Sequence, residues 1–264
     1  MTLEAIEGLG ERLKRFWRYY GQWTRTRTRD TSAYGLAYIS GLLRLESGRN
    51  IAHIGRQTGV SEQNMQHFIS QSPWSGREAI HTMQEAVGHR ADWQGGVLIL
   101  DESGDAKYGD AGAGVSHQYN GRHKQVERSQ VGVFIAYAQG NTWSWVDGEL
   151  FLSEKWFTKA YAAKRQKGEI PSQRRYQKKT ELGWQMIQRA QAAGIPFVAV
   201  TFDSGYGQDA WMRDQCQAAG LEYYADVKGD MRVYSPDPSP AFVPNKQGII
   251  PKQPQILSQW VYSP

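Results

Sequence analysis

Two short apolar runs, each followed by an aspartate, constrain most strongly what this chain can fold into. The runs are Val97–Leu100, which precedes Asp101, and Phe197–Phe202, which precedes Asp203. A short, continuous apolar run is typical of a strand that is buried on both faces of a sheet. The sequence therefore predicts a sheet with two buried strands that each end at a carboxylate.

Further segments supply the rest of an α/β fold. Strands are predicted at Val115–Tyr119, Val131–Tyr137, Trp143–Leu152 and Leu221–Ala225, and helices at Glu181–Ala193 and Asp209–Ala219. The glycine-rich stretch from Gly104 to Gly114 is typical of a hairpin turn. Three strands followed by a helix, a strand, a helix and a strand predict a mixed α/β sheet with flanking helices.

The first 92 residues have helical periodicity instead. Apolar segments at 51–54 and 65–69 flank a short connection in which Gly59 suits a helix end and Ser61 a helix cap. This is the outline of a helix-turn-helix, so residues 1–92 are predicted to form a helical, DNA-binding domain. The alternative is a helical hairpin without that function. Residues 234–264, which hold seven of the ten prolines, are predicted to form an extended tail.

The distribution of charge favours an anionic partner. The formal net charge is +5, and basic residues concentrate in two segments, 155–179 and 12–29. Aromatic residues interleave with the arginines of the second segment, a combination that suits phosphate contacts and base stacking. Nucleic acid is therefore the predicted partner, and solvated helix faces are the alternative interpretation of both segments.

Other function classes are disfavoured. The only cysteine, Cys216, cannot form an intrachain disulfide or a cysteine-based zinc site, and it is predicted to be a small core residue. No apolar run is long enough to span a bilayer, and the first residues do not resemble a signal peptide. We therefore expect no membrane partner and a cytoplasmic location.

The two aspartates predict a metal site. Carboxylates at the ends of neighbouring strands lie at the edge of a sheet, where a ligand can enter. Two such groups repel each other unless a divalent cation lies between them, and Mg²⁺ is often held by one or two carboxylates. A pair of ions at such a site can promote displacement at a phosphodiester. The alternative is that each aspartate caps the following helix or turn.

Ordered motifs around these aspartates resemble bacterial insertion-sequence transposases of the DDE superfamily, in particular the insertion-sequence-701 family. The motifs are 101–109, 114–121, 130–137, 147–156, 179–182 and 203–207. The resemblance covers about residues 30–230. It implies an RNase H-like catalytic core, assigned to residues 93–233, that cleaves and joins double-stranded DNA with two Mg²⁺ or Mn²⁺ ions. It further implies transposon ends and target DNA as substrates, and a homodimer or a full-length transposase as partner.

The resemblance makes Asp101 and Asp203 the first two catalytic acids and metal ligands. It does not fix the role of Glu102, and it gives Tyr206 and Gly207 the task of shaping the turn after Asp203. Lys107 is expected either to contact phosphate or to pair with Asp105. The candidate DNA-binding residues are Lys107, Arg122, Lys124, Lys159, Lys164, Arg165, Lys167, Arg174, Arg175, Lys178 and Lys179.

The third acid of such a site is unknown. The family carries it as a glutamate on a helix well downstream of the second aspartate, but the only glutamate after Asp203 is Glu222, at the start of a predicted strand. Asp226 and Asp230 match no motif. The core is therefore expected to be incomplete at its C-terminal end. A truncated transposase, one part of a split transposase, and a catalytically impaired DNA-binding or regulatory protein all fit this pattern.

Overall fold

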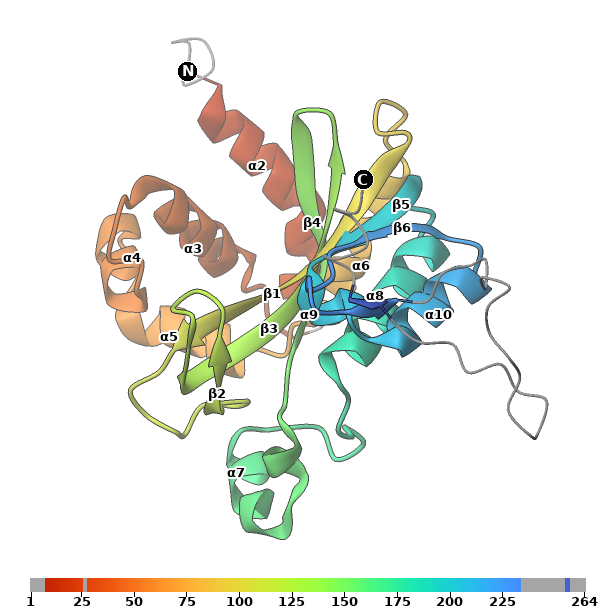
Figure 1. The fold of residues 1–264 in the computed structure, drawn as a ribbon. Coiled ribbons are helices and arrows are strands. Elements are labelled where there is room, and N and C mark those ends of the chain that lie inside the picture. The colour runs from red at the N-terminus through yellow and green to blue at the C-terminus, as the bar shows by residue number, and fades with distance from the viewer. Residues whose placement is uncertain (1–7, 26–27, 234–254, 257–264) are drawn as a thin grey trace, which may run out of the picture. The chain divides into compact units, whose positions relative to one another are not determined.

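The computed structural model describes residues 8–25, 28–233, 255 and 256, and it divides the chain into two compact units, Met1–Val87 and Gly88–Pro264 (Figure 1). The extended tail predicted for residues 234–264 lies outside the described residues, apart from the short strand β8 (Gln255–Ile256), which pairs with β7 (Arg232–Val233). No helix in the described part of the chain is long and apolar enough to cross a membrane.

The first unit is built from helices, as its periodicity predicts. They are α2 (Leu9–Tyr20), the 3-10 helix η1 (Gly21–Thr24), α3 (Ser32–Arg44), α4 (Ile51–Thr58), α5 (Glu62–Gln71) and α6 (Gly76–Gly88). Three side chains of α4 and α5, Ile54, Met65 and Phe68, are almost fully buried. The Phe68 ring stacks on Trp74, whose indole N–H donates to the carbonyl of Phe68 at 3.0 Å. These contacts fix one face of α5 in the core.

The connection between α4 and α5 contains the helix-ending glycine and the helix-capping serine that the sequence predicts. Gly59 ends α4 in the left-handed conformation, with φ of 72°, which favours a residue without a Cβ. Ser61 then caps α5, because its hydroxyl accepts a hydrogen bond from the amide of Asn64 at 3.2 Å. The helix-turn-helix outline is thus present, while its DNA-binding role stays a prediction.

The second unit contains a six-stranded mixed sheet. Its strands are β1 (Gly96–Ala106), β2 (Ser116–Asn120), β3 (Gln125–Gln139), β4 (Thr142–Leu150), β5 (Phe197–Phe202) and β6 (Glu222–Ala225). The helical segments are η2 (Glu154–Phe157), η3 (Lys159–Tyr161), α7 (Ala162–Lys167), α8 (Lys179–Ala192), α9 (Ser204–Gly207) and α10 (Ala210–Ala218).

Strand β1 lies at the centre of this sheet. It runs antiparallel to β3 and parallel to β5, which in turn runs parallel to β6. The long β3 pairs with β2 along its first part and with β4 along its second. This arrangement, with helices flanking the sheet, confirms the predicted mixed α/β fold of the RNase H-like type (Figure 1).

The end predicted for the first strand is wrong. β1 does not stop before Asp101 but continues to Ala106, and Gly104 lies buried in the strand instead of in a hairpin turn. The reason is that β3 continues alongside, pairing Phe134 with Asp101 and Ser129 with Ala106. Backbone hydrogen bonds from β3 hold these polar residues in a strand that their side chains alone do not predict.

One face of the sheet packs against α8. Leu98, Leu100 and Val200 are at most 1% exposed. Burial of an aliphatic side chain of this size stabilises a fold by about 1.5–3 kcal/mol. Gly183 on α8 permits the close approach, because a Cβ there would come within 2.6 Å of the Leu100 side chain. Cys216 on α10 is fully buried, as predicted, and burial raises the pKa of its thiol to about 11.

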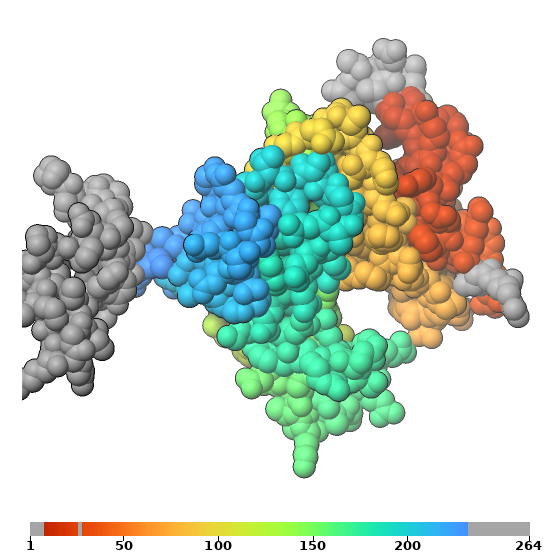
Figure 2. Space-filling model, turned by 90° about the vertical axis from the view of Figure 1, so that its right-hand side faces the viewer, coloured from red at the N-terminus to blue at the C-terminus, as the bar shows by residue number. Residues whose placement is uncertain are grey.

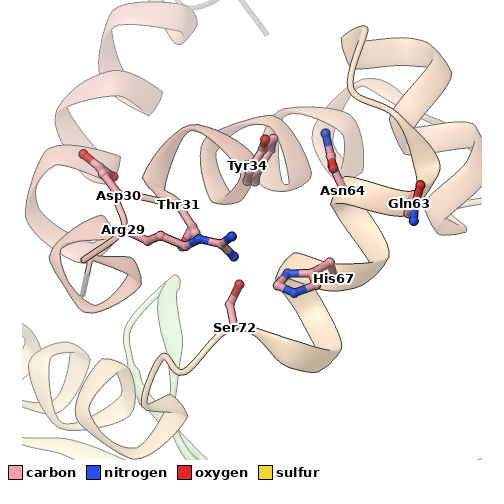
Figure 3. A pocket seen from close by; sticks show the side chains of 8 residues that line it. All are labelled: Arg29, Asp30, Thr31, Tyr34, Gln63, Asn64, His67 and Ser72. Atoms are coloured by element: carbon pink, nitrogen blue, oxygen red, sulfur yellow. The ribbon is translucent and has the colours of Figure 1, made fainter. Parts of the chain in front are cut away.

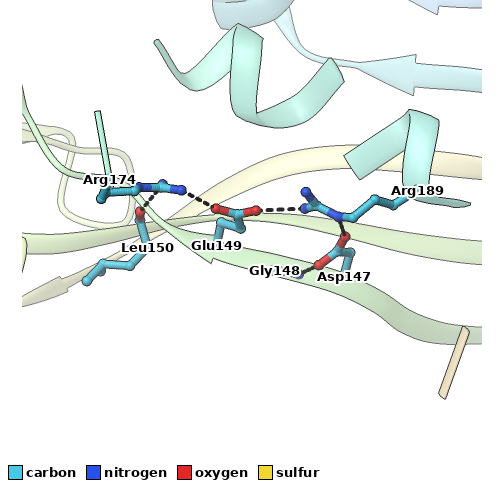
Figure 4. A network of polar contacts seen from close by, with 6 residues as sticks. All are labelled: Asp147, Gly148, Glu149, Leu150, Arg174 and Arg189. Carbon is cyan, nitrogen blue, oxygen red and sulfur yellow. Dashed lines mark hydrogen bonds and ion pairs between the residues drawn. The ribbon is translucent and has the colours of Figure 1, made fainter. Parts of the chain in front are cut away.

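A partly buried charge network joins β4 to α8 on the same face (Figure 4). The Asp147 side chain is fully buried and accepts a hydrogen bond from Arg189 Nε at 2.7 Å. Arg189 also pairs with Glu149 at 2.8 Å, and Arg174 pairs with the other oxygen of Glu149 at 2.8 Å. Asp147 also accepts a hydrogen bond from the amide of Gly148 at 2.7 Å, and Arg189 supplies the opposite charge that a buried carboxylate needs.

We expect Arg189→Leu to lower the free energy of unfolding by about 3–5 kcal/mol, because it leaves the Asp147 carboxylate buried without its guanidinium. Urea denaturation followed by circular dichroism measures the change. Gln188→Leu, at an exposed position on the same helix, is the control and should change stability by less than about 0.5 kcal/mol. Equal stability of the two variants would refute the structural role of Arg189.

Candidate active site at the ends of the parallel strands

The pairing of β1 with β5 sets Asp101 beside Asp203. Leu100 is the register partner of Phe202, and each aspartate is the next residue along its strand direction. Side chains alternate between the two faces of a sheet, so both aspartates lie on the face opposite to that of Leu100 and α8. Both are exposed. The structure therefore brings together the two acids that the sequence singles out.

Local hydrogen bonds orient both carboxylates. Asp101 accepts a hydrogen bond from the amide of Glu102 at 2.7 Å. Asp203 accepts one from the amide of Gly205 at 2.9 Å and so caps α9, which is the alternative role predicted for it. A carboxylate has acceptor sites on both oxygens, so capping through Oδ1 does not exclude a metal ion at Oδ2.

The neighbouring acids differ from this pair because each has a lysine partner. Glu102 points to the α8 face and pairs with Lys179 at 2.7 Å, where both side chains are about one quarter exposed. Asp105 pairs with Lys107 at 2.5 Å, which is one of the two roles predicted for Lys107. These ion pairs offset two negative charges close to Asp101.

Tyr206 belongs to the same site, although the sequence predicts only a turn-shaping role for it. The residue is 2% exposed, and its hydroxyl has no hydrogen-bond partner among the described residues. Burial raises the pKa of this hydroxyl far above its usual value, and the negative charges of Glu102, Asp101 and Asp203 raise it further. The hydroxyl therefore stays protonated.

The third carboxylate has no counterpart in the described residues. Within them, no group of three or more His, Cys, Asp or Glu side chains could hold a metal ion. Asp226 directly follows β6, and its amide donates to the carbonyl of Phe202 at 3.1 Å, so it is placed next to the end of β5, where Asp203 follows. Glu222 lies at the start of β6, where it accepts a hydrogen bond from the Tyr224 hydroxyl. Two aspartates plus water fit the way Mg²⁺ is commonly bound.

The candidate DNA-binding residues fall into two groups. Lys164 pairs with Asp110, Arg165 donates to the carbonyls of Trp156 and Thr158, and Arg175 donates to the carbonyl of Ser172. Arg174, Lys107 and Lys179 belong to the same group, because each forms an ion pair with a carboxylate of the second unit. The remaining candidates are exposed: Arg122, Lys124, Lys159, Lys167 and Lys178.

Four of these five exposed cations lie on two projections of the second unit, and the fifth, Lys178, directly precedes α8. Arg122 and Lys124 occupy the turn between β2 and β3, where Lys124 has a positive φ of 55°. Lys159 and Lys167 belong to the segment of η3 and α7, which stands out from the sheet in both views (Figures 1 and 2). These positions leave the side chains accessible to a large anionic partner.

Comparison with known proteins identifies a family. The profile of a family described as DDE superfamily endonuclease matches residues 18–257, which is most of the chain. No protein of curated function matches.

Mn²⁺ is expected to stabilise the protein, because an ion that binds only the folded state adds about 2.7 kcal/mol at 100 times its dissociation constant. Asp101→Asn and Asp203→Asn should each remove this stabilisation, as measured by urea denaturation with and without Mn²⁺. The control is Glu222→Gln, at the other end of the parallel strands. A metal effect that persists in both aspartate variants would exclude this site.

Proposed function

Because the chain belongs to the DDE superfamily endonuclease family, we propose that it cleaves DNA phosphodiesters with divalent metal ions held by Asp101 and Asp203. The observation that carries the proposal is the β1–β5 register, which sets both carboxylates on one exposed face at the same end of two parallel strands. The ions, Mg²⁺ or Mn²⁺, would activate the attacking oxygen and stabilise the leaving oxygen.

The protein's own residues would prepare this site. Lys179 holds Glu102 on the opposite face of the sheet, so the charge available for metal binding is that of Asp101 and Asp203. The buried hydroxyl of Tyr206 would donate a hydrogen bond to an oxygen atom bound there and so position it. The exposed lysines of the η3–α7 segment would contact the phosphates of the same DNA.

The ordered motifs support a narrower assignment. They are similar to those of insertion-sequence-701 transposases, so we propose that the DNA is double-stranded, that transposon ends and target DNA are the substrates, and that strand transfer follows cleavage. A second copy of the chain or a full-length transposase would be the partner. In a bacterium this reaction takes place in the cytoplasm, on the chromosome.

One observation favours a second candidate function. In the described residues no third carboxylate joins Asp101 and Asp203, and a metal site that lacks a ligand has weaker geometry and less charge neutralisation. The second candidate is therefore a catalytically impaired protein that binds DNA and regulates a full-length transposase. It predicts DNA binding that weakens with salt, without cleavage.

Incubation of the full chain with supercoiled plasmid and Mg²⁺ or Mn²⁺ should produce nicked DNA. Asp101→Asn and Asp203→Asn should each reduce the nicking rate by at least about 100-fold, because each removes a metal ligand. Glu222→Gln should nick at the normal rate. Nicking that survives both aspartate substitutions would refute the proposed site, and binding without nicking by the unaltered chain would select the regulatory function.

The double variant Lys159→Glu/Lys167→Glu is expected to weaken DNA binding equally for all sequences, because contacts to phosphate carry no sequence information. The slope of log affinity against log salt should become shallower by about one for each phosphate that the variant no longer neutralises. Fluorescence anisotropy at several salt concentrations measures both. Lys228→Glu, another exposed lysine of the second unit, is the control. A weakening confined to one DNA sequence would contradict this role.

A further inference from the structure

Three aromatic side chains form a row on the face of the sheet that carries Asp101. Phe134 on β3 is the register partner of Asp101, so its side chain lies on the same face. Trp145 and Trp143 are on the neighbouring strand β4. The ring centroids of Phe134 and Trp145 are 5.5 Å apart, and those of Trp145 and Trp143 are 5.7 Å apart. This aromatic row therefore begins beside the candidate metal site.

Glycines on two strands let the Phe134 ring lie low against the sheet. A Cβ at Gly132 would come within 2.6 Å of the ring, and a Cβ at Gly148 within 2.7 Å. Gly148 is the register partner of Phe134 on β4, and Gly132 precedes it on β3. Because the ring rests over backbone, one of its flat faces is turned away from the sheet. The Trp145 ring is inclined to it by 60° and stands beside it.

The aromatic row is open to solvent. Trp143 is 61% exposed and Trp145 is 50% exposed, while Phe134 is partly exposed. Helix α8 packs against the opposite face of the sheet, over Leu100. Exposed apolar surface that is gathered in one place is typical of an interaction site. Its position next to Asp101 limits the partner to one that also reaches the metal site.

We propose that the aromatic row stacks on an unpaired base of the DNA, next to the phosphodiester that is cleaved at Asp101 and Asp203. A flat ring that faces outward matches the flat face of a base, and such stacking tolerates any base. Inside a duplex both faces of a base are covered by its neighbours, so a base must leave the stack to lie on Phe134. The inference rests on the proposed function, and it names DNA with an unpaired nucleotide at the cut as the substrate.

The charge on the same face of the sheet fits a nucleic-acid strand. Arg128 precedes Phe134 on β3 at an even spacing, so both side chains point to this face. Arg128 is the register partner of His117 on β2, and both residues are exposed. The aromatic row and Arg128 thus lie on either side of Asp101. A strand that places a base on the row can place its phosphates toward the guanidinium.

A polar hollow in the first unit is a competing place for an unpaired base. Its volume is about 490 Å³, and Figure 3 shows the His67 ring and the Arg29 guanidinium pointing into the same space. The amides of Gln63 and Asn64 also line it. These groups suit the polar edge of a base, whereas the aromatic row suits its face. A variant of His67 therefore separates the two sites.

Binding of two DNA duplexes in EDTA tests the proposal. They share one sequence, but one contains an unpaired 2-aminopurine, a base whose fluorescence falls when it stacks on a ring. We expect the chain to bind that duplex about 10-fold more tightly than the fully paired one, with quenching of the fluorescence. Phe134→Leu should lower this preference to about two-fold or less, because it keeps an apolar side chain but removes the ring. Phe134→Tyr should retain the preference.

Two control variants should keep the full preference. Trp211→Ala removes another exposed tryptophan, 39% exposed, from α10, which contacts α8. His67→Ala alters the hollow in the first unit. Thermal unfolding verifies that each variant is folded. Because EDTA removes the metal ions, the outcome is independent of cleavage: nicking without the preference refutes the aromatic row alone, and the preference without nicking refutes the cleavage alone.

Three results would overturn the proposal. The first is equal affinity of the unaltered chain for both duplexes. The second is a preference that folded Phe134→Leu retains or that His67→Ala loses, which would place the base elsewhere. The third is a dimer, seen by analytical ultracentrifugation, that Trp145→Ala dissociates without changing the preference. In that case the aromatic row contacts a second copy of the chain.

Discussion

The pairing of β1 between β3 and β5 is the constraint on which the second unit depends. The antiparallel partner extends β1 past its apolar residues, and the parallel partner sets the register that brings Asp101 beside Asp203. A one-residue slip of β1 would turn Asp101 toward α8 and would turn Leu98 and Leu100 to the opposite face of the sheet. The buried residues Leu98 and Leu100 oppose that shift, so the hydrophobic core also fixes the position of the candidate site.

The acidic residues of this sheet differ in whether they have a cationic partner. On the face toward α8, acids are buried or partly buried and have cationic partners: Asp147 pairs with Arg189, and Glu102 pairs with Lys179. On the other face, Asp105 pairs with Lys107, whereas Asp101 and Asp203 are exposed and follow each other in register at the ends of β1 and β5. Two neighbouring carboxylates without an intervening cation repel each other, so this face suits a divalent ion. Asp101 and Asp203 are therefore better candidates for metal binding than the neighbouring acids, whose charges are offset by lysine or arginine partners.

The proposed function places both the chemistry and the phosphate contacts in the second unit. The second unit carries carboxylates for chemistry on the phosphodiester, which is the same in every DNA sequence, together with exposed lysines for phosphate contacts. The identity of the third acid stays open, because Asp226 lies beside Asp203 but completes no metal-binding group within the described residues.

The sequence by itself determined the elements with a clear apolar pattern, β5 and α8. It also determined the end of α4 at Gly59 and the start of α5 at Ser61, because these residue types favour helix ends. It also singled out both aspartates, because an acid after an apolar run is visible locally. Tertiary structure alone decided that β1 continues past Asp101, since that extension depends on hydrogen bonds from β3. It likewise decided that Arg174 and Lys179 have ion-pair partners and that the Tyr206 hydroxyl is buried near the acids. Pairing, burial and ion-pair formation join residues distant in the chain, and no local pattern encodes them.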